Sequence, residues 1–214
     1  MTTKDGDDTS VYRTGLAMDV AEISRVAVRD RWGLPFMAVG WVHLVIFLAC
    51  YTLISRGDRT ETHFLALWAA ELAAVVVIYR KTIGDRARGP APALLTLGVR
   101  VWITFLILSL NVASLNTMTG LENDWFKPIW GTLSTFGFAT MAWVFHLAFL
   151  IPAVQMSLTG LLLARYPDHA YAIYGVSWWL ALHGIGLTLE HKRAMAGARD
   201  ACPLEGSAPV ASPG

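Results

Sequence analysis

Residues 40–50, GWVHLVIFLAC, decide the fold class of this chain. They lie within a run from 33 to 54 that contains no charged residue and has His43 near its centre. A helix of about 20 apolar residues crosses the hydrocarbon core of a bilayer. The run is therefore long enough to be a membrane span, and His43 is expected in the middle of the membrane.

The composition of the whole chain agrees with a membrane protein. Of the 214 residues, 55% are hydrophobic and only 15% are charged, against about 25% charged in soluble domains. The mean hydropathy is +0.47. The net charge of +1 and the absence of basic runs argue against a nucleic-acid partner. Neither of the two cysteines belongs to a CxxC motif, so the sequence offers no zinc or redox motif.

Outward from the first run, further apolar segments follow at 63–79, 93–115 and 170–189, with a long one at 128–165. A straight helix over 128–165 would be about 57 Å long at 1.5 Å per residue, so it must break. Pro152 is the expected position, because proline disrupts a helix interior but is tolerated in a first turn. The division gives spans at 128–149 and 152–165. The second is short, and a re-entrant or tilted segment is the alternative.

The predicted fold is an all-α polytopic transmembrane bundle over residues 33–190, with about six spans and short loops, or five plus the re-entrant segment. Lys and Arg gather at 1–32, at 80–92 and after 189. Positive residues concentrate on the cytoplasmic side, so both termini are expected there, in a cytoplasmic membrane. Residues 14–32 are predicted to form an amphipathic interfacial helix or a helical extension of the first span. Residues 1–13 and 191–214 are expected to be disordered.

Two ionisable residues of opposite charge fall within consecutive predicted spans. Glu71 is expected near mid-membrane and Arg100 a few residues from the same depth. A charge in the bilayer is costly by roughly 2.5–3.5 kcal/mol on insertion scales, so such residues usually find a partner. We expect an ion pair between Glu71 and Arg100. It is interpreted first as a structural clasp and alternatively as a proton or ion relay. His43 lies level with Glu71 and is considered as a further hydrogen-bond partner for it.

Three histidines within the predicted spans raise the question of haem. His43, His146 and His183 each stand alone in a span, with no HxxxH or HExxH pattern. Two imidazoles at matched depth on facing helices can ligate a b-type haem, whereas a lone histidine can equally bond across helices. No cofactor is predicted, and haem b remains the alternative.

The sequence contains no nucleophile–base pair, metal cluster or phosphate-binding loop. It therefore favours a non-enzymatic structural, assembly or sensory-anchor component of the membrane, in contact with lipid and with a membrane-protein partner or further copies of itself. A small ion- or proton-coupled transporter using Glu71 and Arg100 is the first alternative. A haem-binding electron carrier is the second.

Overall fold

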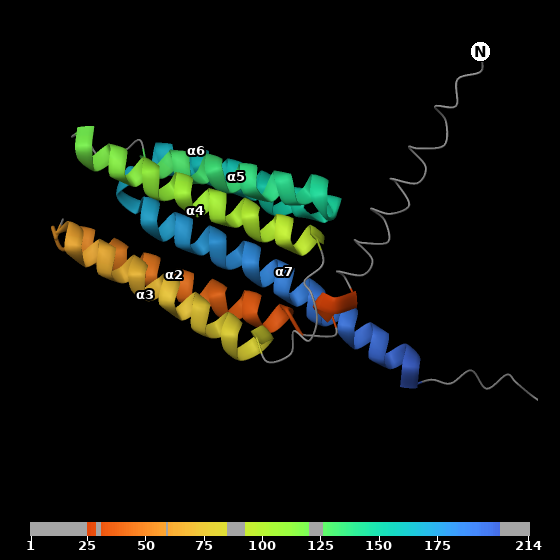
Figure 1. The fold of residues 1–214 in the computed structure, drawn as a ribbon. Coiled ribbons are helices and arrows are strands. Elements are labelled where there is room, and N and C mark those ends of the chain that lie inside the picture. The colour runs from red at the N-terminus through yellow and green to blue at the C-terminus, as the bar shows by residue number, and fades with distance from the viewer. Residues whose placement is uncertain (1–24, 29–30, 59, 85–92, 120–125, 202–214) are drawn as a thin grey trace, which may run out of the picture.

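The structure is a computed structural model that describes residues 25–28, 31–58, 60–84, 93–119 and 126–201 (Figure 1). Every regular element in these ranges is helical, which confirms the all-α prediction. The long helices are α2 (Gly33–Ser55), α3 (Glu61–Tyr79), α4 (Ala93–Thr119), α5 (Phe126–Val144), α6 (Leu150–Arg165) and α7 (Ala170–Ala201). Three short elements extend or join them: η1 (Arg80–Gly84), η2 (Leu147–Phe149) and η3 (Pro167–His169).

Five helical stretches of the described chain are long and apolar enough to cross a membrane: Gly33–Ser55, Glu61–Thr82, Thr96–Leu115, Leu147–Arg165 and Pro167–Ala196. The chain is thus a polytopic membrane protein. The short span expected at 152–165 qualifies once the turn η2 is counted with α6. The sixth helix, α5, is not among them, so the crossing expected at 128–149, and with it the count of six spans, stays a prediction. Many residues of α5, Lys127 included, are buried in the bundle.

The break in the long apolar segment lies upstream of Pro152 rather than at it. Helix α5 ends at Val144, His146 has an extended backbone, and α6 begins at Leu150. Pro152 therefore occupies the first turn of α6, where its missing N–H has no intrahelical acceptor. The expected span boundaries of 149 and 152 are corrected accordingly. The expectation that a proline in this stretch would occupy a first turn is confirmed.

Close backbone contacts fix the arrangement of the helices. Helix α7 packs along α2, and a Cβ added to Gly33 would lie 2.6 Å from the carbonyl oxygen of Gly186. Helix α5 packs on α6 in the same way, since a Cβ on Gly131 would lie 2.6 Å from the Cα of Gly160. Small residues of this kind let membrane helices approach closely, as expected from the sequence.

Helices α3 and α4 lie on the outside of this core. Helix α3 packs against α2 and contributes no buried residue, whereas α4 packs against α5. In Figure 1 the start of α2 and the end of α7 lie at the same end of the bundle. Which side of the membrane that end faces stays a prediction from the charge distribution.

Most of the amphipathic segment predicted at 14–32 lies outside the described residues, as do the predicted tail at 1–13 and residues 202–214 of the second predicted tail. Residues 191–201, expected to be disordered, are instead the end of helix α7. Residues 25–28 are helical. Arg31 has a φ of 58°, in the left-handed region, and the Trp32 N–H donates to the carbonyl of Ala27. The chain therefore turns between these residues and α2 instead of continuing in one straight helix.

Candidate functional site

The hairpin of α2 and α3 brings His43 and Glu71 together. The two residues are 28 positions apart, and Gly57, which has a φ of 79°, is midway between them in the connecting turn. Asp58 fastens that turn by accepting hydrogen bonds from the Thr60 N–H at 2.9 Å and from Nδ1 of His63 at 2.7 Å. Positions equidistant from the turn of an antiparallel hairpin lie at equal depth. His43 and Glu71 therefore face each other near the middle of their helices.

The contact between them is short and largely shielded. Nδ1 of His43 lies 2.5 Å from Oε1 of Glu71, and the two side chains are 13% and 17% exposed. Nε2 of His43 is buried and has no hydrogen-bond partner among the described residues. The contact has two forms: an Nδ1–H that donates to a carboxylate, or a carboxylic O–H that donates to Nδ1. One proton held between two ionisable groups within a span is a recurrent element of proton pathways.

Aromatic rings surround the imidazole of His43. Phe47 stacks on it with ring centroids 4.2 Å apart. Trp178 and Tyr174 of α7 lie at 5.3 and 5.9 Å. The shielding by these rings strengthens the electrostatic interaction between His43 and Glu71, because water is excluded from most of the contact.

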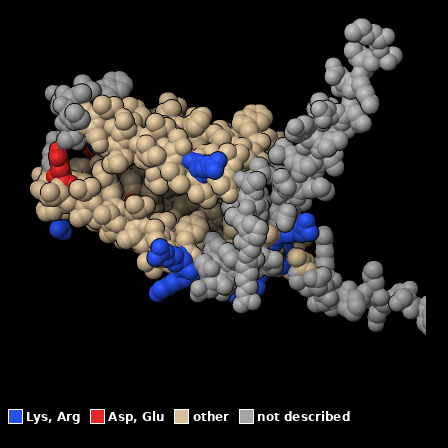
Figure 2. All heavy atoms as spheres, in the orientation of Figure 1, with Lys and Arg blue, Asp and Glu red and all other residues tan. Residues whose placement is uncertain are grey.

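A groove between α3 and α4 runs beside this pair. The two helices follow each other in sequence but pack on different neighbours, and Figure 2 shows the surface hollowed between them. The ring of Trp178 on α7 contacts His43 on α2 and, at 5.5 and 5.9 Å, the rings of Trp102 and Phe105 on α4. Trp68, one helical turn from Glu71 on α3, contacts Trp130 of α5 at 5.6 Å.

The expected ion pair between Glu71 and Arg100 is not formed among the described residues, and Glu71 bonds His43 instead. Helix α4 directs Gly98 and Trp102 toward α5, which leaves Arg100 exposed on the opposite face. The burial cost that motivated the pairing does not apply, because a long side chain this near a helix end can extend toward the membrane surface. The sequence contained the signal for the observed pair, namely the equal spacing of His43 and Glu71 about Gly57.

The other two histidines make local contacts. His146 is not inside a span: its Nδ1 accepts a hydrogen bond from the Ala148 N–H at 3.0 Å and caps the turn η2. The neutral form of such an imidazole carries its proton on Nε2, which leaves no lone pair for a metal. Nδ1 of His183 donates to the carbonyl of Trp179 at 3.1 Å, and its ring lies between Trp179 and Trp41 at 4.6 and 5.5 Å.

His43 and His183 meet one requirement for metal ligation, because both can adopt the tautomer that ligating histidines use. Each can place its proton on Nδ1, held by an oxygen, and keep a lone pair on Nε2, the usual arrangement of ligating histidines. Their helices are in direct contact, however, and a Cβ on Gly40 of α2 would lie 3.0 Å from the His183 ring. Within the described part of the chain no three His, Cys, Asp or Glu side chains form a group that could hold a metal ion. The haem alternative stays a prediction.

Neutral hydrogen bonds join the helices of the core. The hydroxyl groups of Ser134 on α5 and Tyr174 on α7 are 2.8 Å apart. Between α6 and α7, the Gln155 amide donates to the carbonyl of Ser177 at 2.7 Å, and the Thr159 hydroxyl donates to that of Ser177 at 2.8 Å. These contacts connect distant parts of the sequence, and no sequence motif predicts them.

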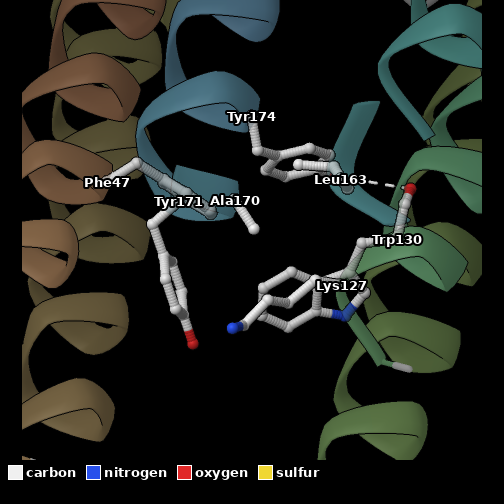
Figure 3. A pocket seen from close by; sticks show the side chains of 7 residues that line it. All are labelled: Phe47, Lys127, Trp130, Leu163, Ala170, Tyr171 and Tyr174. Carbon is white, nitrogen blue, oxygen red and sulfur yellow. Dashed lines mark hydrogen bonds between the residues drawn. The ribbon is translucent and has the colours of Figure 1, made fainter. Parts of the chain in front are cut away.

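A narrow crevice lies in the aromatic core of the bundle (Figure 3). Its lining comprises Phe47, Lys127, Trp130, Leu163, Ala170, Tyr171 and Tyr174. The Lys127 Nζ donates to the carbonyl of Pro167 at 3.3 Å and lies 5.4 Å from the centre of the Tyr171 ring. The crevice has no room for a water molecule, and we interpret it as a packing feature of the aromatic core.

Comparisons with known proteins assign no family to this chain. No family model, no curated protein and no solved structure matches it. The arrangement of side chains described above is therefore the basis on which a function is proposed.

Proposed function

We propose that this protein is a small proton-coupled carrier of the membrane, with the His43–Glu71 pair as its proton-binding site. The observation that carries the proposal is the 2.5 Å contact between two ionisable side chains near the middle of two spans. Ionisable residues at that depth are rare. They belong to ion and proton pathways more often than they serve a purely structural role. Imidazole also changes its charge near neutral pH, which suits reversible proton binding.

The surroundings of the pair support a coupled function. The Glu71 side chain keeps 17% exposure, so the pair is not wholly enclosed by the bundle. Helix α3, which carries Glu71, has no buried residue. It can therefore shift relative to α2 with little loss of packing when the contact changes. A proton-binding residue on a weakly packed helix is the minimal arrangement for coupling protonation to movement.

A structural or assembly role is the second candidate, and the position of α3 favours it. The pair joins α3 to the core, and the exposed face of α3 could contact lipid, a partner protein or another copy of the chain. In this alternative His43 and Glu71 form a permanent clasp. The pair then keeps one protonation state throughout the pH range in which the protein is folded.

Infrared difference spectroscopy during a pH titration of the purified protein separates the two candidates. The carrier proposal expects a carboxyl signal that appears reversibly on acidification within the pH range in which the protein stays folded. That signal should vanish in Glu71→Gln and shift in His43→Gln. Glu61→Gln, at the exposed start of α3, is the control and should keep it. If no Glu71-dependent signal changes in this range, the carrier proposal fails and the clasp is retained.

The haem alternative has its own test. A stoichiometric Soret band in the purified protein that is lost in His43→Ala or His183→Ala would identify an electron carrier instead.

A further inference from the structure

We propose that the end of the bundle at which α2 begins binds the headgroup of an anionic phospholipid, and that this headgroup joins α3 to α2 and α7. The proposal is independent of the proton-binding site. It rests on three observations: exposed bases of three helical segments at one level, an excess of positive charge near that level, and exposed apolar side chains beside the bases.

Four exposed bases lie at this end of the bundle, and we call them the basic rim: Arg31, Arg80, Lys81 and Lys192. The hairpin of α2 and α3 turns at Gly57, and positions equidistant from that turn lie at equal depth. Arg80 and Lys81 are therefore level with Leu34 and Gly33, the first residues of α2.

Helix α7 brings a further base to the same level. It runs antiparallel to α2, and a Cβ on Gly33 would lie 2.8 Å from Cγ of Glu190. Lys192 follows Glu190 by two positions, as Arg31 precedes Gly33 by two, so these two bases lie near one depth. Glu190 accepts a hydrogen bond from Arg193 at 3.4 Å. No ion pair joins a basic-rim side chain to another described residue.

The two ends of the bundle differ in charge. Ten Lys or Arg and four Asp or Glu occur in the segments next to the start of α2, the end of α3 and the end of α7: 25–32, 80–88 and 190–200. Four Lys or Arg and five Asp or Glu occur in the segments next to the opposite ends of these helices and the start of α5: 55–62, 121–130 and 164–170. In Figure 2 the acidic side chains in view lie mainly toward the α2–α3 turn. An anionic partner is therefore favoured at the end that carries the basic rim.

Bases at one level repel one another unless an anion lies among them. At the boundary of a membrane the nearest anion is a lipid phosphate, and each Lys or Arg near an anionic surface strengthens binding about fivefold. Helix α3 contributes no buried residue, so packing alone holds its end weakly. A phosphate shared by Arg80 or Lys81 and by the bases of α2 and α7 supplies the missing attachment.

The side chains beside the basic rim suit the acyl chains of the same lipid. Leu34, Val77 and Leu187 lie within about one helical turn of this level and are 43%, 48% and 59% exposed. A ligand with a phosphate and hydrocarbon chains matches bases placed directly next to exposed apolar residues. An acidic soluble protein would meet the charges and leave the apolar residues uncovered, so the lipid is the better partner.

Native mass spectrometry of the purified full-length protein in a neutral detergent counts the lipids that each chain retains. Phosphatidylglycerol is the probe, and zwitterionic phosphatidylcholine with identical acyl chains is its control. We expect one phosphatidylglycerol per chain at an affinity at least 25-fold above that for phosphatidylcholine, since two or more bases contribute about fivefold each. Inorganic phosphate at the same concentration should not displace the lipid, because it has no acyl chains.

Matched double variants, each of which removes two positive charges from exposed side chains, locate the site. Arg80→Gln with Lys81→Gln should weaken phosphatidylglycerol binding about 25-fold and leave phosphatidylcholine binding unchanged. Arg56→Gln with Arg165→Gln, near the opposite ends of the helices, is the control and should keep the preference for phosphatidylglycerol.

A second pair tests whether the headgroup joins the helices. Arg31→Asn with Lys192→Gln removes bases of α2 and α7 and leaves α3 unchanged, and Asn tolerates the left-handed backbone at position 31. Phosphatidylglycerol should raise the Tm of the unaltered protein, because a ligand that binds the folded state stabilises it. Either double variant of the basic rim should lose that rise, whereas the control variant should keep it.

The inference is overturned if the two lipids bind equally, the result expected if these charges serve only to orient the chain during insertion. It is also overturned if the Arg56 and Arg165 changes reduce binding as much as the Arg80 and Lys81 changes. A loss confined to the α3 variant would refute the bridge between helices. Glu71→Gln should leave the lipid preference unchanged, so the failure of either proposal leaves the other standing.

Discussion

The double-mutant cycle on His43 and Glu71 is the most direct measure of the contact that joins α2 and α3. In Glu71→Leu, the imidazole keeps its polar Nδ1 but loses its only hydrogen-bond partner. In His43→Leu, the Glu71 carboxyl group loses its contact with the imidazole. We expect each single change to destabilise the protein, because a polar group shielded from water then lacks its partner.

The magnitude follows from the burial of the pair. A buried ion pair that loses one member typically costs about 3–5 kcal/mol. Interhelical hydrogen bonds measured in a membrane protein average only about 0.6 kcal/mol. His43 and Glu71 are 13% and 17% exposed and can neutralise by proton transfer, so the value should lie between these limits. We expect about 1.5–3 kcal/mol for each single variant, which is about 3–12 °C in Tm for a chain of this length.

The double variant should be less destabilised than the sum of the single changes. Replacing both members of a buried pair with apolar residues can be nearly neutral, so we expect a coupling of about 1–3 kcal/mol. Thermal unfolding in one detergent at fixed pH, followed by circular dichroism, measures all four proteins. Arg100→Leu serves as control, both alone and combined with Glu71→Leu. It should have little effect alone and show no coupling to Glu71.

Two results would refute this account. Strictly additive losses for His43→Leu and Glu71→Leu would show that the side chains do not interact in solution. Coupling between Arg100 and Glu71 would restore the ion pair expected from the sequence and displace His43 as the partner of the carboxylate.

Three further predictions concern the packing, the α2–α3 turn and the topology. Gly131→Ala should lower Tm by several degrees, because its Cβ would lie 2.6 Å from the α6 backbone. Gly184→Ala, whose Cβ would have nothing within 4 Å, should be neutral or stabilising. Equal effects of the two changes would contradict the close α5–α6 contact. The Thr60 N–H lowers the pKa of Asp58 from 3.8 to about 2, helped by the Thr60 and His63 side chains. This carboxylate therefore stabilises the turn above pH 3.8, and the stabilisation is lost as pH falls through about 2. NMR titration of Asp58 should give the low pKa, and a value of 3.8 or more would refute the prediction. Reporter fusions after Ala196 and within residues 122–125 should report from the cytoplasm and the outside respectively, and the reverse or equal signals would overturn the predicted topology.

The sequence was sufficient for the fold class because hydrophobic length alone determines a membrane helix. It was less reliable where a helix ends. Pro152 was expected to mark the break, yet the break lies at His146, because a proline requires only that it occupy a first turn. The start of that turn depends on tertiary packing. Helix α5 shows the same limit, since Lys127 and the Ser134 hydroxyl bond partners on other elements.

The candidate site could be predicted only in part. Glu71 and His43 were recognised as ionisable groups at one depth, and the hairpin geometry does bring them together. Arg100 was misassigned because the depth of a residue does not indicate which face of its helix it occupies. For α4 that face follows from the packing of Gly98 and Trp102 on α5, which a single sequence does not reveal. The contacts of the Trp178 ring with α2 and α4 are likewise a product of tertiary packing.

The contrast between two kinds of helix contact in this bundle bears on the choice between clasp and carrier. Where α5, α6 and α7 need polar contacts, they use neutral groups: Ser134 with Tyr174, and Thr159 with Ser177. Such bonds hold helices together without placing a charge in the membrane. The α2–α3 contact instead uses two ionisable groups near mid-membrane, where a Ser or Thr hydroxyl could also bridge the helices at lower desolvation cost. An ionisable pair adds one capacity that neutral bonds lack, the binding and release of a proton, and that difference supports the carrier over the clasp.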